Sequence, residues 1–145
     1  MKKAAELRAH LMERVTHLGK DPDRLIVLVE AGRIAARAGS LSFEYRYELK
    51  LVFLDYTDHA DTLIVPLMAW IAQHQPELLQ SAETRDQVIR FTAEIIDHEK
   101  SDVEIVIPLS ERVVVAEVDG QHVATHCDEP PLPDLGGPTG WTLET

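Results

Sequence analysis

The side chains best suited to chemistry gather between residues 55 and 61, where Asp55, Asp58, His59 and Asp61 follow one another closely. Carboxylate and imidazole groups at this density are ligands that a metal ion can use for catalysis. A calcium loop, however, requires a Gly at its turn and a ligating Glu at its far end, and neither is in place. Because the same residue types form turns and cap helices, we interpret the segment as a polar turn.

Two later groups also carry residue types found in metal or acid–base sites. The acidic residues between positions 97 and 102 would need burial to separate their pKa values, and an exposed hairpin loop does not bury them. His122, His126 and Cys127 lie in a strand-like segment, where residues four apart share a face and the next residue points away, so the three do not meet at one zinc ion. No serine has a GxSxG setting and there is no Gly-rich phosphate loop. The sequence therefore favours a protein without catalysis, metal or cofactor.

Composition is that of a soluble globular protein. The chain has 145 residues, of which 45% are hydrophobic and 27% charged, values that predict one domain with one core. Acidic residues outnumber basic ones 25 to 14, which gives a formal net charge of −11 and argues against a general binder of nucleic acid or anionic membrane. The single cysteine excludes an intramolecular disulfide. We see no signal peptide and no membrane span, and expect a reducing compartment.

Charge is divided unevenly along the chain. Residues 1–50 hold ten bases and seven acids, a balance of +3, whereas the remaining 95 residues hold four bases and 18 acids, a balance of −14. Such polarity suits a subunit whose one face meets the opposite face of an identical neighbour, although acids scattered over a solvated surface would produce it too.

Hydrophobic periodicity predicts two helices. One apolar stripe recurs at steps of four, four and three: Leu7, Leu11, Val15 and Leu18. This stripe predicts an amphipathic helix from about residue 3 to 18, with Gly19 as its C-terminal cap. A second, strongly apolar helix is expected after Asp61, with Pro66 in its first turns and Pro76 at its end.

Strand patterns occupy most of the remaining chain. Residues 41–54 alternate apolar with polar side chains, and Val52 and Leu54 make the second face apolar as well, which predicts cover on both sides at that end. Shorter strands are expected at 24–30, 88–97, 102–109, 112–118 and 121–126, and residues 33–37 are compatible with an extended backbone. Asp119-Gly120 predicts a two-residue hairpin turn, and Pro108 belongs on an edge or at a bulge.

These elements predict an α+β fold in a single domain, residues 1–127. Two amphipathic helices would pack on a largely antiparallel sheet of about five or six strands. Residues 128–145 hold four of the eight prolines, which predicts an extended Pro-rich C-terminal arm with Trp141 near its end.

Four segments together resemble those of the phage P2 tail completion protein R family. They read SLSFEYRYELKLVFLDYT (40–57), TLIVPLMAWIAQHQPEL (62–78), LSERVVVAEVDGQ (109–121) and DEPPLP (128–133). The opening helix and DPDRLIVLVEAGRIA (21–35) fit the same pattern in the same order, so the resemblance extends to about residue 135.

The resemblance implies a structural protein that acts late in the assembly of contractile tails of a phage, a prophage or a tail-like bacteriocin. It would cap the head-proximal end of tube and sheath and make the tail competent to join a head, as a hexameric ring by analogy with other terminators. The implied partners are its own copies and the tube, sheath and head–tail connector proteins, in a virion tail assembled in the host bacterial cytoplasm. DNA would pass without specific binding, along an acidic lumen that includes Glu104 and Glu111, and no membrane is involved.

A ring requires contacts between unlike faces of neighbouring subunits. Candidate interface residues lie on the long strand, before it, at the hairpin turn and in the arm. They are Arg33, Arg37, Glu44, Arg46, Glu48, Asp119, Gly120, Pro130, Pro131, Pro133 and Trp141. Two alternatives remain open at this point: a small metal-dependent enzyme that uses the Asp55–Asp61 cluster, and a module that binds one unlike partner as a monomer.

Overall fold

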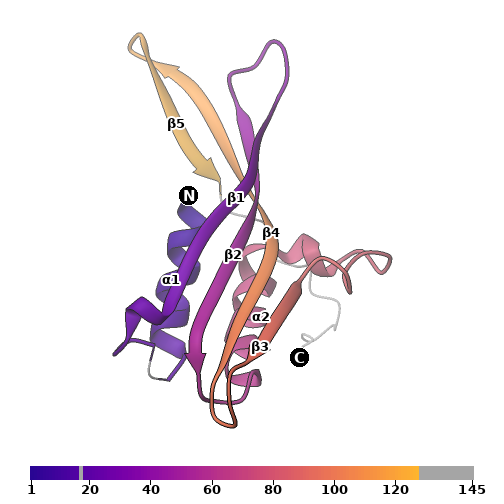
Figure 1. Cartoon of the computed structure of the whole chain (residues 1–145). Helices are drawn as coiled ribbons and strands as arrows, with labels where there is room; N and C mark the ends of the chain where they lie inside the picture. The colour runs from indigo at the N-terminus through magenta and orange to yellow at the C-terminus, as the bar shows by residue number, and fades with distance from the viewer. Residues whose placement is uncertain (17, 128–145) are drawn as a thin grey trace, which may run out of the picture.

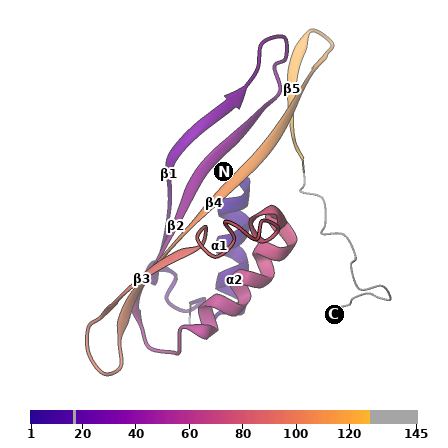
Figure 2. The ribbon, with the colours of Figure 1, turned by 90° about the vertical axis from the view of Figure 1, so that its right-hand side faces the viewer.

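A computed structural model of the chain describes residues 1–16 and 18–127. The elements in chain order are α1 (Lys2–Arg14), the 3-10 helix η1 (Pro22–Arg24), β1 (Leu25–Ala36), β2 (Phe43–Tyr56), α2 (Asp61–His74), the 3-10 helix η2 (Pro76–Leu79), β3 (Arg90–Ile95), β4 (Ser101–Val118) and β5 (Gln121–Cys127). The five strands form one antiparallel sheet, and both α-helices lie on the same face of it (Figures 1 and 2). The predicted fold class is confirmed.

The long strand β4 organises the sheet, whose order is β1-β2-β4-β3 with β5 paired to β4. On the side away from β2, β4 pairs with β3 through residues 101–106 and with β5 through residues 112–118. Between these two partners, β4 is locally an edge strand within the described chain. Pro108 lies in this gap, opposite Glu48 of β2, as its missing N–H requires.

Two β-bulges bend the sheet. The pairing of β1 with β2 shifts between Glu30 and Arg33, where Ala31 has a φ of 50°. The pairing of β2 with β4 shifts between Phe53 and Tyr56, where Asp55 has a φ of 51°. Each bulge inserts one extra residue, which increases the local twist of its strand.

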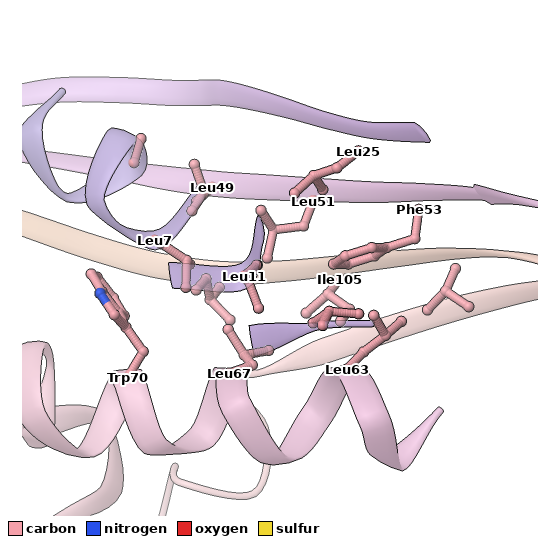
Figure 3. Packing of buried hydrophobic residues seen from close by; sticks show 14 of the residues in the cluster. Leu7, Leu11, Leu25, Leu49, Leu51, Phe53, Leu63, Leu67, Trp70 and Ile105 are labelled. Atoms are coloured by element: carbon pink, nitrogen blue, oxygen red, sulfur yellow. The ribbon is translucent and has the colours of Figure 1, made fainter. Parts of the chain in front are cut away.

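The hydrophobic core fills the space between the two helices and the covered face of the sheet (Figure 3). Leu7 and Leu11 of α1 and Leu63, Leu67 and Trp70 of α2 are each no more than 2% exposed. They pack against alternate residues of the strands, among them Leu49, Leu51, Phe53 and Ile105. The alternation over residues 41–54 therefore predicted the buried face of β2 correctly.

The first helix is shorter than its apolar stripe. The helix ends at Arg14. The N–H of Val15 still donates to the carbonyl of Leu11 at 2.9 Å, but the backbone of Val15 is extended, so the helix does not continue. Val15 and Leu18 are nevertheless 3% and 4% exposed, so the whole stripe enters the core, its last two residues from a turn. Gly19 consequently does not cap the helix.

Three strand predictions require correction. The first strand continues to Ala36, and the segments 102–109 and 112–118 belong to the single strand β4. Val52 and Leu54 are only half-buried, and no described element covers their face, so the expected cover on both sides is wrong. Val52 is shielded instead by its cross-strand neighbours Ile26 and Glu104.

Beyond the helices, the sheet continues as two projecting hairpins, formed by the ends of β1 and β2 and by β4 with β5 (top of Figures 1 and 2). In the described part of the chain, neither helix is long and apolar enough to cross a membrane. One half of the sheet thus carries the core, and among residues 1–16 and 18–127 no helix covers either face of the other half.

Candidate assembly surfaces

Three residues of the possible cation cluster, Asp55, His59 and Asp61, have structural roles where β2 leads into α2. Asp55 forms the second bulge; its N–H donates to Oδ1 of Asp102 at 2.9 Å, and its carbonyl accepts from Nη1 of Arg24 at 3.1 Å. On the exposed turn that follows, the N–H of Asp61 donates to Nδ1 of His59 at 3.1 Å. Within residues 1–16 and 18–127, no three His, Cys, Asp or Glu side chains are placed to hold a metal ion.

The acidic group between positions 97 and 102 lies in the β3–β4 hairpin loop, except for Asp102, which belongs to β4. The carboxylate of Asp97 accepts the backbone N–H groups of Glu99 and Lys100 at 2.8 and 2.9 Å, and these two hydrogen bonds lower the pKa of Asp97. Asp97 is thus a turn-forming residue on the surface, as expected for a solvated loop.

The three residues His122, His126 and Cys127 are divided between the two faces of β5. Nδ1 of His126 lies 3.3 Å from Oε1 of Glu111 on the helix side of the sheet, and its ring stacks on Tyr45. Cys127 pairs with Arg112, whose side chain points to the opposite face. The prediction that the three do not converge is confirmed.

Glu111 is a buried carboxylate that joins α1 to the sheet. Its Oε1 accepts the N–H of Lys2 at 3.0 Å, and its Oε2 accepts the N–H of Lys3 at 3.2 Å and the hydroxyl of Tyr47. Glu111 is only 3% exposed. No side chain of α1 itself caps its N-terminus, so Glu111 supplies the negative charge that the helix dipole favours there. Its burial also corrects the expectation that it faces a lumen.

The hydroxyl of Tyr47 remains a hydrogen-bond donor to this carboxylate. Burial, followed by the hydrogen bond and the negative charge of Glu111, raises the pKa of Tyr47 well above its usual range. The sequence pattern of β4 indicates the burial of Glu111. The alternation that buries Ile107, Leu109 and Val113 places residue 111 on the same face.

A second buried polar contact extends from the same place toward α2. Nζ of Lys3 donates to Oε1 of Gln75 at 2.6 Å, and Gln75 donates in turn to Glu77 and to Oγ of Ser110 at 3.0 Å. Lys3 and Gln75 are 7% and 2% exposed. Together with Glu111, these residues tie both helices to β4 at the point where the projecting hairpins begin.

The charged candidates of β1 and β2 lie together on the face away from the helices. Nε of Arg46 is 2.6 Å from Oε1 of Glu44, and Nη2 of Arg90 is 3.1 Å from Oε2 of Glu48. Arg33 is the direct cross-strand neighbour of Arg46. Two like charges opposite each other destabilise a strand pair, and an anion between them would relieve this repulsion.

This face is hollowed between the two hairpins into a groove of about 350 Å³, which we call the arginine groove. It is lined by Ala35, Arg37, Glu44, Arg46, Arg112 and Val114, among others. Arg46 already holds Glu44, whereas Arg37 and Arg112 have no ion-pair partner among the described residues. The groove therefore carries an excess of positive charge in a protein whose net charge is −11.

Two outer edges of the sheet, those of β1 and β3, are open and partly apolar. Ile34 on β1 is 64% exposed, and Phe91 and Ile95 on β3 are 71% and 80% exposed. Neither β1 nor β3 has a second strand beside it in the part of the chain that the structure describes. Unpaired strand edges with apolar side chains are surfaces that proteins normally cover.

The Asp119-Gly120 turn closes the hairpin of β4 and β5. Asp119 and Gly120 have φ values of 51° and 77°, the positive angles that a type I′ turn requires at both central positions. The predicted turn is confirmed, and it places these two candidates at the tip of one projecting hairpin (Figure 1).

With this geometry in place, comparison with known proteins is decisive. The model of the P2 phage tail completion protein R (GpR) family matches residues 1–130. The chain belongs to this family. It is 39% identical over 135 residues to tail completion protein R of Escherichia phage P2, in an alignment that covers 92% of this chain and 87% of that protein. No solved structure matches the chain.

Membership of the tail completion protein R family confirms the resemblance read from the sequence. The family match includes every candidate from Arg33 to Gly120, and also Pro130. Pro131, Pro133 and Trp141 lie beyond residue 130, and all four arm candidates fall outside the residues that the structure describes.

Proposed function

We propose that this protein completes the tail of a contractile phage or phage-like particle, as a structural component without catalysis. The observation that carries this proposal is the 39% identity, over 92% of the chain, to tail completion protein R of phage P2. In detail, the protein caps the head-proximal end of tube and sheath and makes the tail competent to join a head. It becomes part of the virion tail in the cytoplasm of the host bacterium, in contact with tube, sheath and head–tail connector proteins.

The subunits act as a homo-oligomeric ring, which we take to be a hexamer. A closed ring requires two unlike surfaces on each subunit. The open edges of β1 and β3 supply such a pair, since β1 exposes Ile34 and β3 exposes Phe91 and Ile95. Burial of these side chains between neighbours would contribute roughly 25 cal/mol for each Å² of apolar surface removed from water.

The charge of the molecule suits a ring through which DNA passes without specific binding. A net charge of −11 repels phosphates over most of the surface. Glu104 is an exposed example, its side chain being 41% exposed beside Lys50. Reversal of Glu104 to Lys should slow DNA delivery by particles that have normal tails, and unchanged delivery would count against an acidic lumen.

The experiment that tests the proposed function is electron microscopy of tails from a strain lacking this gene. We expect tails of irregular length, or tails of correct length that never join heads, and the two phenotypes distinguish termination from joining. Normal, head-joined and infectious tails would refute the proposal.

Purified protein should then restore completion when it is added to these tails, and this reaction tests the ring contacts. Phe91→Lys places a charge on the β3 edge and should abolish restoration. Val65→Lys is the matched control, because Val65 is 67% exposed and belongs to α2, not to either edge strand. If the two variants restore tail completion equally well, β3 is excluded from the ring interface. If a single bound copy per tail is enough for completion, the protein is a monomeric interaction module.

A further inference from the structure

The arginine groove lies next to the point where the acidic arm begins. Ala35, Glu44, Arg112 and Cys127 are consecutive cross-strand partners, so they form one row across β1, β2, β4 and β5 on the face away from the helices. Three members of this row, Ala35, Glu44 and Arg112, line the groove. Cys127, the fourth, is the last residue of β5 and leads directly into residue 128.

We propose that residues 128–134 fold back across β4 and occupy the arginine groove of their own subunit. Adjacent strands are about 4.8 Å apart, so Cys127 is about 10 Å from the row position on β2. An extended chain advances about 3.3 Å for each residue, and three residues therefore span this distance. The seven residues 128–134 are long enough to follow the groove from Arg112 to Arg37.

The charges of segment and groove are complementary. Residues 128–134 read DEPPLPD and include three carboxylates, those of Asp128, Glu129 and Asp134. Two groove arginines, Arg37 and Arg112, have no ion-pair partner in the described chain, and Arg33 and Arg46 repel each other across the strands. A carboxylate that bridges guanidinium groups satisfies both features with charge-assisted hydrogen bonds.

Because residues 128–134 are tethered close to the arginine groove, weak ion pairs are sufficient to dock them there. An exposed ion pair strengthens binding only roughly twofold to fivefold. A segment attached within a few residues of its site, however, has an effective concentration in the millimolar range. The prolines at positions 130, 131 and 133 also fix φ, which reduces the conformational entropy that docking removes. Ala35 and Val114 provide apolar surface for their rings.

The test uses the full chain with Cys127→Ser and a nitroxide label on Leu132→Cys. Paramagnetic broadening of backbone amides is measured at residues 35–40, on the far side of the groove from the tether. We expect these amides to lose most of their signal. The loss should disappear in Arg37→Glu/Arg112→Glu and return when Asp128→Lys and Glu129→Lys are added. If charge reversal impairs folding, the milder variant Arg37→Gln/Arg112→Gln replaces it. This variant should lower the ratio of docked to free arm roughly fourfold or more.

Two controls separate docking from other causes of broadening. Lys20→Glu/Arg85→Glu changes the net charge equally at sites outside the groove and should preserve the signal loss. A mixture of labelled, isotopically unenriched protein with unlabelled, enriched protein reports contacts between copies and should show no broadening. Broadening that survives Arg37→Glu/Arg112→Glu would overturn the proposal, and broadening in the mixture would assign the groove to the arm of a second copy instead.

Discussion

Replacement of Glu111 by Ala is the sharpest test of how the sheet is joined to the helices. The substitution removes the acceptor of two N–H groups at the start of α1 and of the Tyr47 hydroxyl. It also removes the negative charge beside the helix N-terminus and the partner of His126 at 3.3 Å. All these groups meet around a side chain that is 3% exposed.

The magnitude follows from what remains without a partner. A buried donor that loses its acceptor costs about 1–3 kcal/mol, and removal of one member of a buried charged network costs about 3–5 kcal/mol. Water entering at the partly exposed His126 offsets some of this cost, so we expect a loss of about 3 kcal/mol in the free energy of unfolding. For a chain of this length, each kcal/mol lowers Tm by about 3 °C, which gives a fall of about 10 °C.

Urea and thermal unfolding followed by far-UV circular dichroism measure this effect. The matched control is Glu117→Ala, because Glu117 lies on the same strand and the same face, with its side chain 70% exposed. We expect the control to stay within about 0.5 kcal/mol of the unaltered protein. Glu111→Gln retains one acceptor oxygen and should lose an intermediate amount, about 1–2 kcal/mol. Equal stability of Glu111→Ala and Glu117→Ala would refute the role assigned to Glu111.

Three further predictions concern pH, the hairpin tip and the acidic turn. Burial raises the pKa values of Tyr47 and Tyr56 in the folded state, so the unfolded chain releases these protons first and the free energy of unfolding falls as pH rises above about 10. Tyr47→Phe should flatten this fall in urea titrations at several pH values, and an unchanged slope would contradict it. Gly120→Ala has open space for its Cβ but a φ of 77°, so thermal melts should show a loss of about 1 kcal/mol from backbone strain alone. Asp58→Ala, and treatment with EDTA, should leave Tm and tail completion unchanged; loss of completion with a ring still formed would favour the metal-dependent enzyme.

Much of the fold could be predicted because its strands obey period two. Alternation identified the buried face of β2 through Tyr47, Leu49 and Leu51, and Asp119-Gly120 located the turn between β4 and β5. These signals are local: the side-chain pattern of a strand is set by its own backbone, and the turn depends on two residues. Local patterns also sufficed for α2, which begins at Asp61 and ends before Pro76 as predicted.

The features that escaped prediction depend on tertiary contacts. The bulge between Glu30 and Arg33 has its positive φ of 50° at Ala31 and not at the adjacent Gly32, so the glycine alone does not identify the bulged position. The alternation along β4 places Glu111 on the buried face, but its partners, the start of α1 and Tyr47, come from distant parts of the sequence and could not be predicted. The arginine groove is equally nonlocal, because it joins Arg37 of the first hairpin to Arg112 of the second.

The division of charge along the sequence acquires a spatial meaning in this fold. Arg37 and Arg46, from the basic first 50 residues, line the arginine groove together with Arg112, which is one of only four bases in the acidic remainder. They meet on the hairpin half of the sheet, whereas the apolar core occupies the helix-covered half. Substitutions of Arg37 or Arg112 should therefore change binding with little change in stability. Glu111 lies where the two halves join, so Glu111→Ala should impair tail completion at temperatures below its own Tm, because the hairpins lose their fixed position before the core unfolds.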